Sequence, residues 1–351
     1  TSFMHGASGL LYLRWRPLLD GPLFGAFGGY GMDGSRTERS AMVSKVGKWV
    51  GAPEQESLWQ SRPIQGEIGI VYIPETQIFD YSQNGKTDNY ARSMEGAYQG
   101  FYDNNIQADW VHVDHIDEYS LLYLPFPVML VEATAKKLSD WVAAGGTLIS
   151  EGCPAYFGDR GHVGQQQPNF GLDEVFGAKE TYVEFVPDLL DEERFNFSGT
   201  SVWGGIYLQA YEAVGGTAVG WYADGRVAAV ENEYAKGRTL LLGTMAGYGH
   251  GLHAPEGSAS FFKEVLAYGG QEQHVTSSDV NIKARIHNGD GGVYLWIANP
   301  TRQERPVRIE IGSAWGPFSS ASTLWGAEVE VSGQTVELTC PARDVTVIAL
   351  A

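Results

Sequence analysis

The segment LSDWVAAGGTLISEG, residues 138–152, contains the end of a helix and the start of a strand. Its Gly-Gly pair predicts a helix stop, because glycine readily adopts the left-handed conformation that closes helices. The short apolar run that follows is typical of a buried strand. Two earlier segments repeat this alternation: the strand-like GEIGIVYIPE (66–75) and the helix-like NYARSMEGAYQGFYDNN (89–105). Strands that alternate with helices of this length predict a parallel α/β sheet.

The predicted α/β domain covers residues 66–270. Two further strands are expected at ADWVHVDHI (108–116) and YSLLYLPFPVML (119–130). Residues 215–244 carry strand patterns and an Asp-Gly pair at 224–225, which is a hairpin signal. A helix is expected at 258–270, where the domain ends.

Different patterns flank this domain. GLLYLRWR (9–16) predicts one buried strand, and DGSRTERSAMVSKVGKWV (33–50) predicts a helix capped by Ser35 or Thr37. These two elements make residues 1–60 a separate N-terminal piece. Residues 275–351 alternate short strands with Asn-Gly, Asp-Gly and Ser-Gly turns, which predicts a small antiparallel β-sandwich.

The composition excludes several classes of protein. A net charge of -18 argues against nucleic acid and anionic membranes as partners, because both attract Lys and Arg. A neutral ligand such as a sugar remains compatible with this charge. No stretch approaches the ~18 apolar residues of a membrane span, and no signal peptide is visible. These features predict a cytoplasmic protein.

The two cysteines, Cys153 and Cys340, lie far apart in the sequence. One disulfide is possible, but separate buried thiols are the favoured interpretation. Cys153 follows a predicted strand in LISEGCPAYFG, an arrangement similar to the nucleophile elbow of thiol hydrolases and glutamine amidotransferases. His162 is the candidate base for such a thiol. Because no fixed Cys–His spacing supports this hypothesis, a structural thiol is favoured.

The histidines give two further candidate sites. In HVDHIDE, His112 and Asp114 share one face of a strand while His115 faces the other way, so they do not converge as zinc ligands would. No metal or other cofactor is therefore expected. His250 and His253 lie in the glycine-rich stretch AGYGHGLHAPEG (246–257), which predicts a loop. Such a loop either contacts a ligand, lines a subunit interface or is a solvated turn.

Taken in order, these segments resemble the C-terminal part of family 42 glycoside hydrolases, the β-galactosidase family. HGASGLLYLRWRP is similar to the last strand of that family's (β/α)8 barrel, and GGYGMDGSRTERSAMVSKV to the final barrel helix. GIVYIPETQIFDYS, LSDWVAAGGTLISEG and GLDEVFGA are similar to its flavodoxin-like trimerisation domain. The resemblance covers nearly the whole chain. It implies a barrel remnant, a flavodoxin-like (glutamine-amidotransferase-like) sheet with helices on both faces, and a small β domain.

The resemblance also implies a role. A homotrimer that binds a carbohydrate is expected, with Arg14, Trp15 and Arg16 at one wall of the sugar site. The loop LLDGPLFGAFGGYG (18–31) lacks the glutamate and histidine that family members carry there, which puts galactose specificity in doubt. The family's two catalytic glutamates belong to earlier barrel strands, so a second chain supplying those strands is one possible partner. The alternatives are a non-catalytic oligomerisation or carbohydrate-binding module, and a thiol hydrolase using Cys153.

Overall fold

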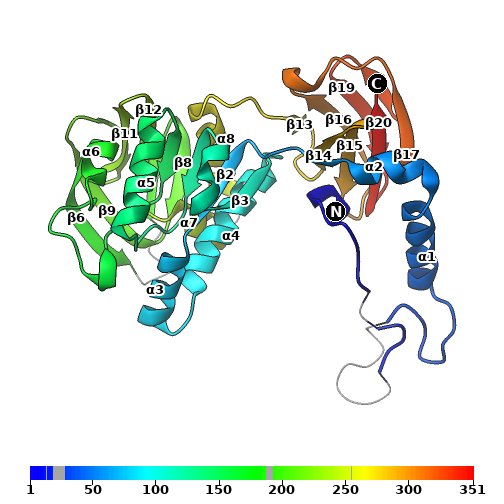
Figure 1. Ribbon diagram of the computed structural model, residues 1–351, viewed down its shortest axis with the longest axis horizontal. Helices are drawn as coiled ribbons and strands as arrows, with labels where there is room; N and C mark the ends of the chain where they lie inside the picture. The colour runs from blue at the N-terminus through cyan, green and yellow to red at the C-terminus, as the bar shows by residue number, and fades with distance from the viewer. Residues whose placement is uncertain (13, 19–27, 187–192, 254) are drawn as a thin grey trace. The chain divides into compact units, whose positions relative to one another are not determined.

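The computed structural model describes residues 1–12, 14–18, 28–186, 193–253 and 255–351 (Figure 1). These residues form two compact units. One unit combines Thr1–Ile64 with Ser277–Ala351, and the other contains Gln65–Thr276. The N-terminal piece that the sequence assigns to a domain of its own thus folds in one unit with the C-terminal strands.

The unit of residues 65–276 is built on a mixed 11-stranded sheet. Its parallel half has the order β3, β2, β4, β5, β12. These strands are β3 (Ala108–His112), β2 (Ile68–Tyr72), β4 (Leu121–Leu124), β5 (Thr147–Ser150) and β12 (Gly237–Leu242). The parallel strands expected from the apolar runs at 66–75, 108–116, 119–130 and 147–152 are confirmed.

Antiparallel strands extend this sheet beyond β12. They are β6 (Ala178–Val186), β7 (Glu193–Phe197), β8 (Thr200–Gly204), β9 (Ile206–Ala213), β10 (Thr217–Tyr222) and β11 (Val227–Tyr234). The β10–β11 hairpin turns at the predicted Asp-Gly pair, where the Tyr222 amide donates to the Arg226 carbonyl. The sequence did not predict the pairing of β6 with β9, because partners this far apart in the chain carry no local turn signal.

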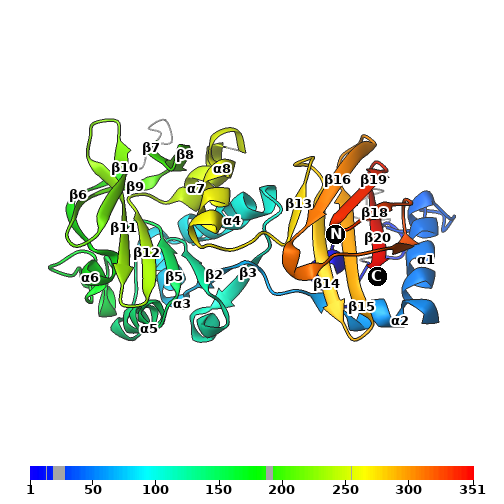
Figure 2. The same ribbon diagram turned by 90° about the horizontal axis from the view of Figure 1, so that it is seen from above.

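Helices cover both faces of the parallel half (Figure 2). The strands alternate their side chains between two apolar cores: Tyr123 of β4 faces one core, and Leu122 and Leu124 face the other. The first core is shared with α4 (Asp88–Asp103), α7 (Ala246–His253) and α8 (Pro255–Tyr268). The second is shared with α5 (Glu132–Ala143) and α6 (Leu172–Phe176). This two-sided burial explains the continuous apolar runs of the strands.

One helix of this unit, α3 (Pro74–Asn84), was not predicted. Its buried residues are the polar Thr76 and Asp80, so it carries no apolar stripe for a pattern to detect. Asp80 accepts hydrogen bonds from Asn84 Nδ2 at 2.8 Å and from the Tyr90 amide at 3.0 Å. The helix is therefore held by hydrogen bonds to a buried carboxylate.

The other unit contains two antiparallel sheets, as the C-terminal turn pattern predicts. The first has the order β1 (Arg62–Pro63), β14 (Lys283–Gly289), β15 (Gly292–Asn299), β20 (Asp344–Leu350), β17 (Ala321–Trp325). The second has the order β13 (Val275–Ser277), β16 (Arg305–Ile311), β19 (Thr335–Cys340), β18 (Glu330–Ser332). Short helices complete this unit: η1 (Phe3–His5), η2 (Pro53–Gln55), α2 (Glu56–Gln60) and η5 (Ser313–Trp315).

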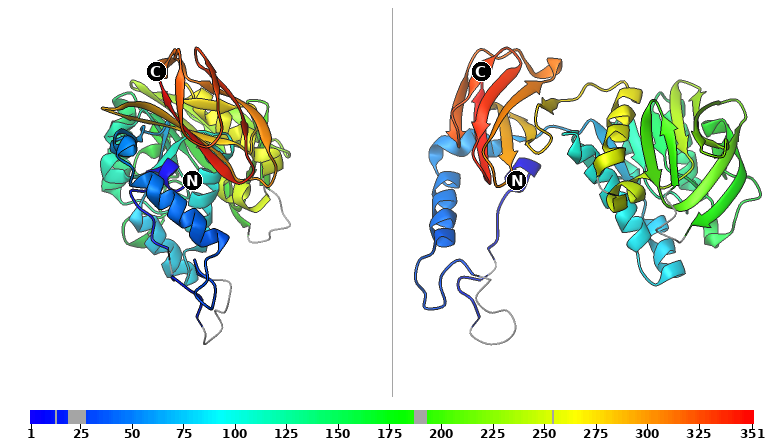
Figure 3. Two further views of the ribbon diagram at one scale, coloured as in Figure 1. Left: turned by 90° about the vertical axis from the view of Figure 1, so that its right-hand side faces the viewer. Right: turned by 180° about the vertical axis from the view of Figure 1, so that it is seen from behind.

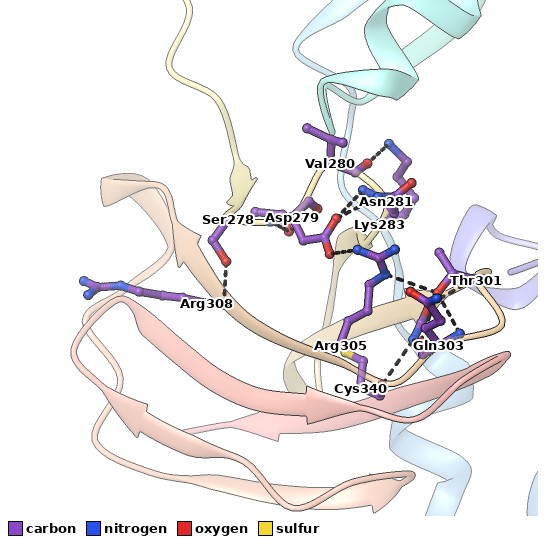
Figure 4. A network of polar contacts seen from close by, with 12 residues as sticks. Ser278, Asp279, Val280, Asn281, Lys283, Thr301, Gln303, Arg305, Arg308 and Cys340 are labelled. Carbon is purple, nitrogen blue, oxygen red and sulfur yellow. Dashed lines mark hydrogen bonds and ion pairs between the residues drawn. The ribbon is translucent and has the colours of Figure 1, made fainter.

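A polar network ties the start of β14 to the second sheet (Figure 4). Arg305 of β16 donates to Asp279 at 2.8 Å, and the Asn281 amide donates to the same carboxylate at 2.9 Å. Asn299 donates to the carbonyl of Cys340 at 3.1 Å.

Cys340 and Cys153 are both buried and free, which confirms the separate thiols favoured by the sequence.

The predicted N-terminal helix is confirmed as α1 (Glu38–Val50), and Thr37 is its cap. Thr37 and Ser40 exchange hydrogen bonds in a capping box. The indole of Trp49 attaches the helix to its unit by donating to the Leu324 carbonyl at 3.0 Å. Ser40 is the one buried residue of α1, so most of the predicted apolar face, including Val43 and Val46, remains partly exposed.

The predicted strand at 9–16 is wrong for the part of it that the structure describes, residues 9–12 and 14–16. A strand requires a neighbour for its backbone N–H and C=O groups, and none of the strands in the described part of the chain pairs with these residues. Figure 3 shows this segment leaving the sheets of its unit after η1. Its apolar side chains are exposed, most of all Leu11 at 97%. Apolar patterning alone therefore did not produce a strand here.

Within the described residues, no helix combines the length and the apolar character that spanning a membrane requires.

A matched pair of glycine substitutions tests the packing of α4 against α7. A Cβ on Gly96 of α4 would lie 1.9 Å from the Gly247 carbonyl oxygen, whereas one on Gly47 of α1 would meet nothing within 4 Å. We expect Gly96→Ala to destabilise its unit by about 3 kcal/mol, and Gly47→Ala to be neutral or stabilising by up to ~1 kcal/mol. Calorimetric unfolding of both variants checks this, and a neutral Gly96→Ala would contradict the close crossing.

Candidate functional site

The three residues expected at a sugar site lie on the irregular N-terminal segment. Trp15 is 71% exposed and Arg16 is also exposed, whereas Arg14 is half-buried. Arg14 has a backbone φ of 72°, a left-handed conformation that turns the chain before Trp15. The side chains of these residues therefore do not share one environment.

A residue that the sequence analysis did not select, Tyr30, packs directly on Trp15. Their ring centroids are 4.0 Å apart at an interplanar angle of 25°. The Tyr30 amide donates to the Trp15 carbonyl at 2.9 Å, and the Gly29 amide donates to the Arg14 carbonyl at 3.3 Å. These bonds close the loop that begins after Arg16. Sequence spacing gave no sign of this stack. Most of the predicted glycine-rich loop (18–31) lies outside the described residues.

The loop expected around His250 and His253 is wrong, because residues 246–253 form helix α7. His250 is buried, and its ring lies 3.2 Å from the Asp103 carboxylate and in hydrogen-bond contact with the Ser258 hydroxyl. It thus connects α4, α7 and α8. The side chain of His253 lies outside the described residues. The structure therefore shows His250 as a buried residue that packs between three helices.

Cys153 has the sharply turned backbone expected of a nucleophile elbow, but its side chain lacks the surroundings that activate a nucleophilic thiol. Its φ is 58°, a strained value for a non-glycine residue at the end of a strand. The side chain is 1% exposed, and burial raises the pKa of the thiol well above its ordinary value. The candidate base His162 is exposed. A neutral, buried thiol opposes the thiol-hydrolase hypothesis.

The predicted strand HVDHI ends early. β3 stops at His112, and Val113–Glu118 form the 3-10 helix η3. His112 Nδ1 accepts a hydrogen bond from the Asp114 amide at 3.2 Å and lies 3.4 Å from its carboxylate. In the parts of the chain that the structure describes, no three metal-binding side chains come together.

A buried carboxyl group that the sequence analysis did not single out lies at the end of β5. Glu151 is fully buried and accepts three hydrogen bonds. Tyr123 of β4 donates at 2.8 Å, the Phe126 amide at 2.9 Å, and the Gly247 amide at the start of α7 at 2.5 Å. Burial raises the pKa of Glu151 to about 7, although the three donors act in the opposite direction. This carboxyl group fastens α7 to the carboxyl edge of the parallel strands.

Comparison with known proteins now identifies the α/β unit. Residues 67–267 match the family described as the beta-galactosidase trimerisation domain. The chain belongs to this family. The match covers nearly all of the unit Gln65–Thr276, including β5, Glu151 and Cys153.

Curated relatives and solved structures extend the similarity beyond the trimerisation domain. Beta-galactosidase BgaB of a Geobacillus species is 26% identical in an alignment of 357 positions that covers 96% of this chain and 49% of BgaB. Beta-galactosidase LacA of Lactobacillus acidophilus is 25% identical over 62% of this chain and 32% of its own length. The chain spans between about a fifth and a half of the length of the curated relatives it matches.

Two β-galactosidase structures share the fold. That of G. stearothermophilus has a TM-score of 0.79 at 19% identity, over 99% of this chain and 49% of its own. That of Bacillus circulans sp. alkalophilus has a TM-score of 0.78 at 18% identity, over 100% of this chain and 51% of its own. The chain is thus similar to the C-terminal part of these enzymes.

The raised pKa of Glu151 predicts how the stability of the trimerisation domain changes with pH. Between its ordinary value of 4.5 and about 7, Glu151 ionises in the unfolded state before it ionises in the folded state. The free energy of unfolding therefore decreases as pH rises through this window, by roughly 3 kcal/mol from this group.

Glu151→Gln removes this titration and leaves one of the three donors without an acceptor. We expect the variant to have a lower free energy of unfolding than the natural protein at pH 5. This difference in free energy should become smaller toward pH 8. Denaturant unfolding of both proteins at several pH values measures the difference. A difference that stays constant from pH 5 to 8 would show that Glu151 does not titrate in this range.

Proposed function

We propose that this chain is the C-terminal part of a β-galactosidase-like retaining glycoside hydrolase. Its trimerisation domain would assemble the enzyme into a homotrimer, and its N-terminal segment would form one wall of a sugar site. The observation that carries this proposal is the match of residues 67–267 to the trimerisation domain, together with a fold shared with two β-galactosidases over nearly the whole chain.

The strand order supports the finer description of this domain as flavodoxin-like. Numbered along the chain, the five parallel strands lie in the order 2-1-3-4-5, with helices on both faces. This is the order of flavodoxin-like doubly wound sheets. In this proposal the domain serves as a scaffold for assembly.

The exposed N-terminal segment supports a role in a barrel. Leu10, Leu11 and Tyr12 are 44%, 97% and 54% exposed, although their sequence has the pattern of a buried strand. Pairing between two other strands of a (β/α)8 barrel would satisfy their backbone groups and bury these side chains. Helix α1 would then follow as the last barrel helix, with its exposed apolar face against the strands.

In this arrangement the N-terminal segment would bring Arg14, Trp15 and Arg16 to the edge of a glycoside site. The stacked Trp15 and Tyr30 rings offer an apolar surface of the kind that packs against a sugar ring. A retaining glycosidase needs two carboxyl groups about 5 Å apart. We propose that strands outside these 351 residues supply both, either from the same polypeptide or from a second chain.

An activity assay with the 351-residue chain tests whether the two catalytic carboxyl groups lie outside it. We expect no hydrolysis of an aryl β-galactoside by this chain alone, because neither catalytic carboxyl group belongs to it. Activity is expected to appear when a polypeptide carrying the remaining barrel strands is added. Turnover by the isolated chain, retained after further purification, would show that the catalytic pair lies within it.

The proposed trimer contact lies on α3. Ile78 and Tyr81 share one face of this helix and are 65% and 60% exposed. Val163, 52% exposed, lies on the adjoining loop, which packs on α3 through the Phe79 and Phe157 rings with centroids 4.5 Å apart. An exposed apolar surface on an assembly domain is a natural place for a second copy to dock.

Negative charges introduced on this surface test the contact. We expect Ile78→Asp with Tyr81→Asp to lower the association state, because a subunit contact would bury both carboxylates without partners. The control is Trp221→Asp, which places a carboxylate on the equally exposed strand β10. Sedimentation velocity over a range of concentrations measures the effect. An α3 variant that associates as the control does would exclude α3 from the contact.

The alternative, a non-catalytic oligomerisation or carbohydrate-binding module, makes the opposite prediction for the assay. Such a module would associate normally, but addition of the missing barrel strands would produce no activity. The same experiment therefore separates the two functions.

A further inference from the structure

The carboxyl edge of the parallel strands is where open α/β sheets bind their ligands. In this chain the edge contains a sharp turn after β5, with positive φ angles at Cys153 (58°) and Ala155 (55°). The position beside this turn is filled by the side chain of Gln209, which β9 carries and which is wholly buried.

The residues around Gln209 form hydrogen bonds with both the oxygen and the NH2 group of its primary carboxamide. Its oxygen accepts from the Cys153 amide at 2.7 Å and from the Tyr211 hydroxyl. Its NH2 group donates to the Glu180 carboxylate at 2.6 Å. A carboxylate ligand would face Glu180 with a like charge, and an alkyl group would offer no acceptor to the Cys153 amide and no donor to the Glu180 carboxylate. The chemistry of this position therefore selects an amide.

The groups that hold the carboxamide have other bonds that keep them in place. The Glu180 amide donates to the Gln167 carbonyl at 2.8 Å, and the Tyr211 hydroxyl lies 2.9 Å from the Leu242 carbonyl. The backbone of Gln209 itself donates to the Gly243 carbonyl at 2.7 Å. Shortening the Gln209 side chain therefore removes the amide and leaves its partners in position.

We propose that the edge beside Cys153 is a binding site for a primary carboxamide, and that its occupant is the protein's own Gln209. The bond from Gln209 to the elbow fastens the β6–β9 pair to the end of β5 and closes the ligand position of the sheet. This inference goes beyond the proposed function and does not depend on it, since it concerns the interior of one subunit.

Chemical rescue tests the proposal. Gln209→Ala should unfold at a lower temperature than the natural protein, and acetamide, which matches the atoms removed beyond Cβ, should raise its melting temperature by about 2–4 °C in a saturable manner. Acetate should not do so, because Glu180 repels it. The control Leu240→Ala removes a fully buried apolar side chain from the same unit, and neither it nor the natural protein should respond to acetamide.

An equal response of Gln209→Ala and Leu240→Ala to acetamide would overturn the proposal, as would equal rescue by acetate. If Gln209→Ala does not fold unaided, the amount of folded protein recovered on dilution from denaturant into acetamide replaces the melting temperature. Recovery that is the same with and without the amide would also overturn it. None of these outcomes alters the association state, which separates this test from that of the trimer.

Discussion

The parallel pairing of β5 with β12 is the interaction on which the α/β unit depends. It places Leu148 beside Thr239 and Ile149 beside Leu240, and it adds β12, whose other edge pairs with the antiparallel strand β11, to the parallel half of the sheet. Both strands send side chains into both cores, so the pairing also aligns the helices on the two faces. At its carboxyl end, Glu151 binds the start of α7 and Cys153 binds Gln209. Two buried polar contacts of the unit therefore lie just beyond the carboxyl end of this pairing.

Sequence patterns predicted the elements whose stability comes from apolar burial, and missed those held by other means. The strands of the parallel half and helices α4, α5 and α8 carry strong apolar patterns, and all were predicted. Helix α7 was mistaken for a loop because it is rich in glycine. Its glycines instead allow contact with α4, since a Cβ on Gly247 would lie 2.3 Å from the Ser93 carbonyl oxygen. Single-sequence reasoning cannot distinguish a glycine that bends the chain from one that admits a neighbouring helix.

The candidate sites show a similar division. The turn at Cys153 was predicted from the strand and glycine that precede it, but the burial that makes its thiol unreactive depends on β6 and β9, which no local pattern indicated. Residues 9–16 show the reverse case. Their apolar pattern is that of a strand, yet strand formation requires partners that the described residues do not provide. Both cases show that local pattern specifies a tendency and that tertiary neighbours decide the outcome.

In the proposed function, the unit Gln65–Thr276 acts as an assembly scaffold. Its family match indicates trimerisation, and its ligand position is occupied from within by Gln209. The most direct test is the mass of the 351-residue chain in solution, measured by light scattering during size-exclusion chromatography. Trimeric assembly through this unit predicts a single species of three times 38.3 kDa. A mass of 38.3 kDa that persists as the protein concentration is raised would contradict it.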